Sequence, residues 1–159
     1  MSTASTLEIL SRSEAQTQDV GRRLGKAARG GELLLLSGDL GTGKTVLVRG
    51  LAEGLGFAAA REVRSPSFTL MNLYSGRCVL RHFDVYFTEA FEDLRRNELE
   101  EALARGEVVA VEWGERFARE LPEDRLEVRM EHVDPGTRRL WLDSGGPGSG
   151  AWLKRFREG

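Results

Sequence analysis

The residues of this chain with the clearest chemical potential form one glycine-rich run, from Gly38 to Thr45. Its sequence, Gly-Asp-Leu-Gly-Thr-Gly-Lys-Thr, matches the pattern G-x-x-x-x-G-K-[ST] at every fixed position. Glycines let such a loop curl until successive backbone N–H groups point at phosphate oxygens. The lysine of such a loop bridges the β- and γ-phosphates of a nucleotide, and the hydroxyl that follows it binds Mg²⁺. The run therefore predicts a nucleoside-triphosphate site, whose cradle is formed by Asp39, Leu40, Gly41, Thr42, Gly43, Lys44 and Thr45.

A phosphate loop of this kind works with a carboxylate that holds Mg²⁺ or orients the attacking water. Two acids are candidates, because Asp84 follows the apolar-rich stretch 78–83 and Glu112 follows Val108–Val111. Ligands of parallel α/β sheets bind beyond the carboxyl ends of the strands, so we expect both acids near the loop as catalytic groups. Each acid taken alone also fits a solvated strand end, and the residues do not decide which of the two orients water.

The segments that flank the loop have the pattern that its chemistry needs. Four successive leucines, residues 33–36, are too few for a helix and predict a strand buried on both faces. Residues 44–55 place apolar side chains at helical spacing and end at Gly56. Strand, loop and helix therefore follow one another in the order that a phosphate loop requires.

Other elements alternate along the rest of the chain. Ser13 and Gln16 form a capping box that predicts a helix to about Arg29. We further expect a hairpin from 68–74 and 78–85, a helix over 92–105, a strand over 108–111, a short helix over 115–121 and a hairpin from 126–130 and 140–142. This order predicts an α/β fold, a P-loop NTPase-like three-layer core with a mixed sheet and antiparallel hairpins.

The last residues differ in composition from the rest. Residues 144–150 read Ser-Gly-Gly-Pro-Gly-Ser-Gly, which is typical of a flexible linker, and 152–157 favour a short docking helix. We therefore predict a P-loop ATPase domain over 1–143 and a flexible glycine-rich tail over 144–159 with a short terminal helix.

Composition narrows the class of protein. The chain has 159 residues, 40% of them hydrophobic, and a net charge of −2, so it is about one globular domain without the overall charge of a basic nucleic-acid module. A local basic patch is still compatible with that charge. The single cysteine, Cys78, favours a reducing cytoplasm. Aliphatic runs of four residues are far too short to span a membrane, and the first residues lack the pattern of a signal peptide.

Several segments together resemble the TsaE (YjeE) family of small bacterial P-loop ATPases, which serve the threonylcarbamoyladenosine modification of tRNA. The resemblance spans about residues 7 to 142. Besides the phosphate loop it rests on Ser65-Pro-Ser-Phe-Thr-Leu70, His82-Phe-Asp-Val-Tyr86 and Val111-Glu-Trp113, in the family's order and approximate spacing. The phosphate loop alone is unspecific, whereas the four motifs together are restrictive.

The resemblance implies a function and its partners. It implies an Mg²⁺-dependent ATPase that binds ATP or ADP, hydrolyses ATP weakly on its own and acts with TsaB- and TsaD-like proteins. The resemblance further implies that the protein reaches tRNA indirectly through these partners, in the cytoplasm. By the same resemblance Glu112 is a metal-site carboxylate beside Thr45, and Asp84 is an acid near the γ-phosphate.

The resemblance also assigns residues that the motif chemistry does not reach. Thr17 falls where the family contacts nucleotide, and Ser65-Pro66-Ser67 falls on a switch-like loop, although Ser-Pro alone is an ordinary turn starter. Near the last hairpin Thr137 or Arg138 contacts the nucleotide. The residues leave that choice open, with Arg138 as the expected contact.

Other functions fit parts of the same pattern. A small-molecule kinase would pair this loop with an arginine-bearing lid, for which Arg95-Arg96 is the candidate, but five acids between 92 and 101 favour a salt-bridged helix there. A nucleotide-gated binding module with negligible hydrolysis is a third reading. Direct tRNA contact through the basic residues of 154–157 is a weaker one.

Overall fold

The computed structural model describes residues 5–66, 69–86 and 91–159, with the backbone alone for 91–96. In this part of the chain one mixed sheet has the strand order β1-β7-β6-β2-β5-β4-β3. The strands are β1 (Thr6–Ser11), β2 (Leu33–Gly38), β3 (Met71–Ser75), β4 (Val79–Asp84), β5 (Val108–Glu112), β6 (Leu126–Asp134) and β7 (Thr137–Ser144). The helices are α1 (Glu14–Ala27), α2 (Lys44–Gly54), α3 (Phe91–Ala104) and α4 (Pro147–Glu158), with 3₁₀ turns η1 (Ala60–Glu62) and η2 (Gly114–Phe117).

Strand β2 lies at the centre of the sheet, parallel to both β5 and β6. Strand β4 is parallel to β5, whereas the pairs β1 with β7, β6 with β7, and β3 with β4 are antiparallel. Successive side chains of a strand point to opposite faces, so the four leucines of β2 supply both faces of the sheet. Leu34 and Leu36 pack in one core, and Leu33 and Leu35 pack in the other.

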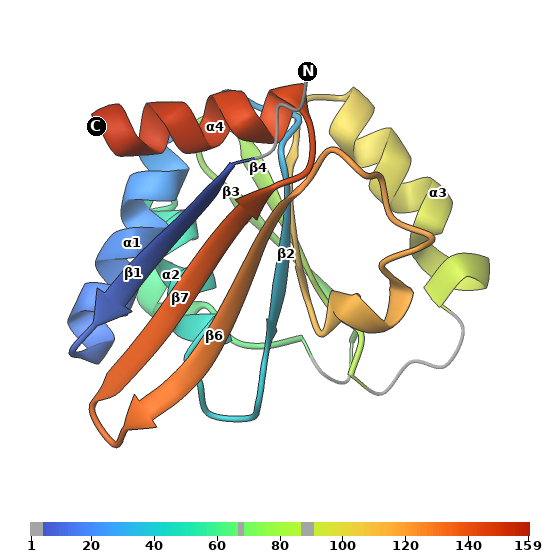
Figure 1. The fold of residues 1–159 in the computed structure, drawn as a ribbon. Helices are drawn as coiled ribbons and strands as arrows, with labels where there is room; N and C mark the ends of the chain where they lie inside the picture. Colours follow the sequence, from blue (N-terminus) through green and yellow to red (C-terminus); the bar gives the residue numbers. More distant parts are fainter. Residues whose placement is uncertain (1–4, 67–68, 87–90) are drawn as a thin grey trace.

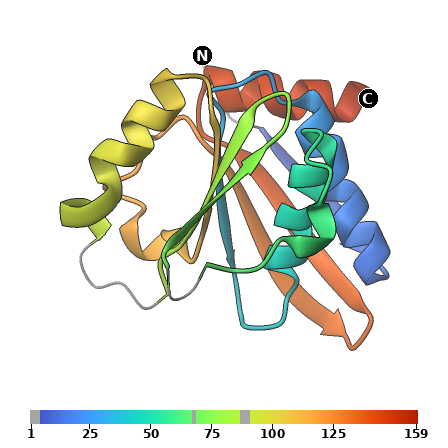
Figure 2. The ribbon, with the colours of Figure 1, turned by 180° about the vertical axis from the view of Figure 1, so that it is seen from behind.

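Helices cover both faces of the sheet (Figure 1). Helices α1, α2 and α4 lie on one face, over the core that holds Leu34 and Leu36, and α3 and η2 cover the other. Figure 2 shows the hairpin β3–β4 from behind, with α3 to one side. The predicted three-layer α/β fold with a mixed sheet is confirmed.

Helices α1 and α2 approach each other until their backbones touch. A Cβ atom added to Gly50 would lie 2.0 Å from the carbonyl oxygen of Gln18. Only a residue without a side chain fits there. This close crossing sets where α2, and therefore the loop that precedes it, lies on the sheet.

Most predicted elements are present, with shifted ends. The Ser13 hydroxyl accepts from the Gln16 N–H at 3.1 Å, as expected of the capping box, but the Gln16 amide accepts from the N–H of Arg12. The terminal hairpin is longer than predicted, and the helix predicted over 115–121 is the shorter turn η2. Strand β1 has no counterpart in the sequence-based prediction, because only every second side chain of this edge strand is partly covered.

The prediction of a flexible linker over 144–150 is wrong. Ser144 ends β7, and α4 begins at Pro147 and continues to Glu158. The Asp124 carboxylate accepts from the N–H groups of Gly148 and Ser149 at 2.9 and 2.8 Å and so caps this helix. The glycines let the Asp124 side chain approach the backbone closely, because a Cβ atom on Gly146 would lie 2.7 Å from that side chain. Composition alone does not reveal a cap that comes from 24 residues earlier in the chain.

None of the helices in the described ranges is long and apolar enough to cross a membrane.

Candidate functional site

The glycine-rich run joins β2 to α2, as its pattern predicts. Gly38 adopts φ 140°, and a Cβ atom there would lie 2.5 Å from the carbonyl oxygen of Met130 on β6. The neighbouring strand therefore forces glycine at this bend. The Thr42 hydroxyl donates to the carbonyl oxygen of Asp39 at 2.8 Å, which closes the turn. Helix α2 begins at Lys44, so its positive end faces the space beyond the loop.

Lys44 is buried and lies against the loop. Its ammonium nitrogen donates to the carbonyl oxygens of Gly38 and Asp39 at 2.5 and 3.0 Å. It also lies 3.9 Å from the ring centroid of Trp113, within the range of a cation–π contact. Burial lowers the pKa of Lys44, against the nearby carboxylates, of which Glu112 is the strongest. The ammonium group is thus held in place by groups that a phosphate can replace.

The two candidate carboxylates are neighbours across the sheet. Asp84 ends β4 and Glu112 ends β5, and the register of these parallel strands pairs the two residues. Glu112 is also paired with Leu36 of β2, one strand nearer the loop. Both acids are buried, with 3% and 2% of their surface exposed. The expectation that they emerge together at the edge of the phosphate loop agrees with this register.

Glu112 is held by hydrogen bonds from two sides. The Thr45 hydroxyl lies 3.1 Å from each of its carboxylate oxygens, and His82 Nε2 lies 2.5 Å from Oε2. His82 is itself fully buried, and its Nδ1 lies 3.5 Å from the hydroxyl of Tyr74. That hydroxyl donates to the carbonyl oxygen of Arg64 at 3.3 Å. A continuous chain of contacts therefore joins Thr45 to the backbone just before Ser65.

Asp84 has a separate set of partners. Its Oδ2 accepts a short hydrogen bond from the Ser65 hydroxyl, and Oδ1 accepts from the N–H of Tyr86 at 2.9 Å. The Tyr86 ring packs on Trp113 with centroids 4.8 Å apart. The loop predicted to act as a switch thus meets one carboxylate through Ser65. Ser67 lies outside the described residues.

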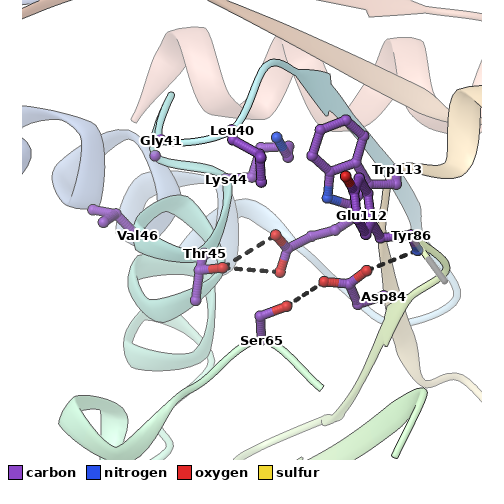
Figure 3. A pocket seen from close by; sticks show the side chains of 11 residues that line it. Leu40, Gly41, Lys44, Thr45, Val46, Ser65, Asp84, Tyr86, Glu112 and Trp113 are labelled. Carbon is purple, nitrogen blue, oxygen red and sulfur yellow. Dashed lines mark hydrogen bonds between the residues drawn. The ribbon is translucent and has the colours of Figure 1, made fainter. Parts of the chain in front are cut away.

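One cavity of about 530 Å³ is lined by Lys44, Thr45, Ser65, Asp84 and Glu112 (Figure 3). Thr45 and Glu112 face each other across it, and Ser65 reaches Asp84 beside them. Trp113 and Tyr86 close one side. The cavity combines a cation, a hydroxyl and two buried carboxylates, which is the donor set expected around a metal-bound triphosphate.

A second cavity of about 390 Å³ lies on the other side of the same loop. Thr17 and Arg138 both line it, although they are far apart in the sequence. The Thr17 hydroxyl lies 2.7 Å from that of Ser11, and Arg138 donates to the carbonyl oxygen of Gly41 at 3.4 Å. Of Thr137 and Arg138, both described, Arg138 is the one that lines the cavity. Gly41, Gly43 and Val46 line both cavities, so a ligand on the loop can reach into each.

A metal ion fits this site only together with a ligand. Within the described residues no group of three or more His, Cys, Asp or Glu side chains could hold a metal by itself. Mg²⁺ usually takes one or two protein oxygens and completes its shell with phosphate oxygens and water. Thr45 and Glu112 supply such a pair, and two buried carboxylates side by side favour a nearby cation.

His82 has no role in the sequence-based prediction, where it is only the first residue of the motif His-Phe-Asp-Val-Tyr. The available signal was spacing, because residues two apart on a strand share a face, and Asp84 follows His82 by two. Trp113, which appears in the sequence-based prediction only as the last residue of the Val-Glu-Trp motif, contacts Lys44. The proposed lid residues Arg95 and Arg96 have side chains outside the described part of the chain.

A strand, a glycine loop of this pattern and a helix, with acids at the ends of neighbouring parallel strands, define the phosphate-loop class of α/β proteins. The family model described as "Threonylcarbamoyl adenosine biosynthesis protein TsaE" matches residues 11–140. The chain therefore belongs to the TsaE family, whose members take part in the biosynthesis of tRNA threonylcarbamoyladenosine, as the resemblance in the sequence implied.

Curated relatives agree with this assignment. The chain is 37% identical to the tRNA threonylcarbamoyladenosine biosynthesis protein TsaE of Treponema pallidum, over 84% of this chain and 98% of that protein. It is 41% identical to the protein of the same name from Streptomyces coelicolor, over 73% and 79% of the two chains. The crystal structure of YdiB from Bacillus subtilis shares the fold, with a TM-score of 0.81 at 24% identity over 99% of this chain and 98% of that one.

Proposed function

We propose that this protein binds ATP with Mg²⁺ and hydrolyses it, to ADP and phosphate, in support of threonylcarbamoyladenosine synthesis. One observation carries the proposal: Lys44, Thr45, Asp84 and Glu112 converge on one cavity at the start of α2. A structural ion-pair cluster would not need the phosphate-loop backbone beside it. The second cavity, lined by Thr17 and Arg138, shares loop residues with the first and would take the nucleoside in this proposal.

Each residue has a distinct task in this proposal. Lys44 leaves the carbonyl oxygens of the loop and binds the β- and γ-phosphates. The N–H groups of residues 39–45 hold the phosphate oxygens. Thr45 and Glu112 hold the Mg²⁺ ion, which neutralises charge on the phosphates when it is bound. Asp84, which accepts a hydrogen bond from Ser65, orients the attacking water in this proposal.

The proposal includes partners. The two cavities draw on residues from the end of β1 to β7 and leave little of the chain for a second substrate, so the output of hydrolysis passes to other proteins. We propose TsaB- and TsaD-like proteins as these partners, in the cytoplasm where tRNA is modified. Alone, the protein is expected to hydrolyse ATP slowly.

The test is ATP hydrolysis by the purified protein, with and without TsaB- and TsaD-like proteins of the same organism. We expect stimulation by the partners, with loss of nucleotide binding in Lys44→Ala. Glu112→Gln is expected to retain nucleotide binding in EDTA, to lose part of the Mg²⁺-dependent gain in affinity and to lose hydrolysis. Arg119→Gln, an exposed residue outside both cavities, is the control for activity. Absence of both stimulation and co-purification would overturn the partner proposal, and absence of hydrolysis under all conditions would overturn the ATPase proposal.

The same variants separate hydrolysis from simple gating. If nucleotide binding alone controls the partners, Glu112→Gln still supports modification of tRNA while Lys44→Ala does not. If turnover is needed, both variants lose modification equally. Modified tRNA measured by mass spectrometry distinguishes the two cases.

A further inference from the structure

The ends of α1 and α4 meet in a groove of about 430 Å³ that the nucleotide site does not use. Four cationic side chains line it. Arg23 and Lys26 lie on α1, Arg29 follows the end of that helix, and Arg155 faces them from α4. Glu158 is the one acid among the described lining residues. Helix α4 lies across the end of α1 (Figure 1).

Two of these cations build the groove. The Arg23 guanidinium lies 4.3 Å from the ring centroid of Phe156 and donates to the Phe156 carbonyl oxygen at 3.1 Å. Arg155 donates to the carbonyl oxygen of Ala27 at 2.8 Å and pairs with Glu32 at 3.0 Å. These contacts join α1 to α4 and fix the shape of the groove.

The other cations are available to a ligand. Lys26 and Arg29 are exposed, and among the described contacts neither side chain has a hydrogen bond or an ion pair. Lys154 and Arg157 extend the charge along the exposed side of α4. A cation in the last turn of a helix interacts favourably with the helix dipole, which accounts for Lys26 but not for Arg29, which lies beyond the end of α1.

The positive charge around this groove contrasts with the negative net charge of the whole chain. Four cations line the groove beside one acid, Glu158, on a chain whose net charge is −2, and a second acid, Glu32, pairs with Arg155. The groove lies at the start of β2, whereas the phosphate loop follows the end of the same strand. A six-residue strand separates the two by roughly 20 Å. A ligand of the groove can therefore bind while the nucleotide site is occupied.

We propose that this groove binds the phosphate backbone of tRNA directly. A row of exposed lysine and arginine side chains on a shallow surface fits phosphate contacts, which position a protein on a nucleic acid without reading its sequence. The TsaE family acts in the modification of tRNA, so tRNA is the polyanion that this surface meets in its pathway. The inference is independent of ATP hydrolysis.

The test compares two variants with the same change of net charge. The groove variant replaces Lys26, Arg29 and Arg157 by Gln, and the control variant replaces the exposed Arg61, Arg119 and Arg129 by Gln. Binding of a fluorescent unmodified tRNA transcript is measured by anisotropy from 50 to 200 mM NaCl. We expect binding by the native chain to weaken steeply with salt, and the groove variant to bind about 10-fold more weakly with a salt slope smaller by about 2–3.

The control variant should keep binding within about twofold and keep the salt slope. Equal loss in both variants, salt-independent binding or no binding by the native chain would each overturn the proposal. Retained tRNA binding together with lost capture of the partner proteins would also overturn it, in favour of an acidic protein surface. Nucleotide binding shows whether each variant is folded. If the triple variant does not fold, Lys26→Gln alone replaces it and should lower the salt slope of tRNA binding by about 1.

Discussion

At the scale of single residues, Glu112 is the point where the site and the interior of the sheet meet. It accepts hydrogen bonds from Thr45 in the cavity and contacts His82 in the core. A buried carboxylate with partners on both sides has a fixed direction, and partners behind a metal ligand typically contribute 10–100-fold to metal affinity. His82 is therefore a positioning residue for the proposed Mg²⁺ site.

Replacing His82 tests this role. His82→Leu removes the contact with Glu112 and is expected to weaken the Mg²⁺-dependent gain in ADP affinity by about 10–100-fold. ADP affinity in EDTA should change little, because the phosphate loop does not contact His82. The amide of His82→Gln can still reach Glu112 and should restore part of the gain. Titration calorimetry with and without Mg²⁺ measures both quantities, and equal loss in the two conditions would contradict a positioning role.

A second residue-scale prediction concerns the proton of Lys44. Burial lowers its pKa below the ordinary value of 10.5, so the free protein loses this positive charge at a lower pH than an exposed lysine would. Nucleotide phosphates favour the charged form and raise the pKa again. ADP affinity should therefore fall as the pH rises toward and beyond the lowered pKa, and binding in that range should take up a proton. Calorimetry in buffers of different ionisation enthalpy detects the uptake, which Lys44→Arg should abolish if that variant still binds ADP.

At the scale of elements, α4 is an integral part of the core. Trp152 is fully buried, and its Nε1–H donates to the carbonyl oxygen of Leu24 at 2.9 Å. Phe156 packs in the same core. The Gly-Ser-Pro composition before this helix indicated a linker, and nothing local in the sequence showed that Asp124 caps the helix.

Trp152→Ala should destabilise the protein by about 3–5 kcal/mol, because it leaves a large cavity and an unpaired carbonyl group. Lys154→Ala, on the exposed side of the same helix, should change the free energy of unfolding by less than about 0.5 kcal/mol. Urea unfolding measures both changes. A loss below about 1 kcal/mol for Trp152→Ala would show that α4 is not part of the cooperative core.

The crossing of α1 and α2 gives a further prediction at this scale. Gly50→Ala places a carbon atom 2.0 Å from the Gln18 carbonyl oxygen, so the helices must separate. We expect a loss of about 1–3 kcal/mol in the free energy of unfolding and weaker nucleotide binding, because α2 carries Lys44 and Thr45. Gly159→Ala, at the end of α4 and outside both cavities, where the nearest atom is 3.4 Å away, is the control. Unchanged unfolding and ADP affinity in Gly50→Ala would contradict this account.

At the scale of the whole molecule, the sequence predicted most of the fold because its signals were local. The leucines of β2, the glycine loop and the capping box of α1 each depend on neighbours within a few residues. The site was predictable as far as strand ends share an edge, which brought Asp84 and Glu112 together. Three other features depend on residues that are distant in sequence, so a local pattern does not reveal them. They are the contacts that link Tyr74, His82 and Glu112, the cap of α4, and the basic groove.

The net charge of −2 likewise concealed an uneven distribution. The phosphate loop follows one end of β2, and the basic groove precedes the other. A whole-molecule consequence follows from the tRNA proposal: nucleotide state and tRNA can be varied separately, and saturating ADP should leave the salt slope of tRNA binding unchanged.

The three tryptophans divide the molecule into regions that can be observed optically. Trp113 contacts Lys44 in the proposed nucleotide site, Trp141 of β7 contacts Arg129 and Arg139, and Trp152 of α4 is fully buried in the core. Trp113 and Trp141 each contact cationic side chains and are partly exposed, whereas Trp152 lies in the apolar core, so their emission should differ in wavelength and in quenching. Variants that retain one tryptophan each, with Phe at the other two positions, would report phosphate entry, changes on β7 and docking of the last helix, without an added dye.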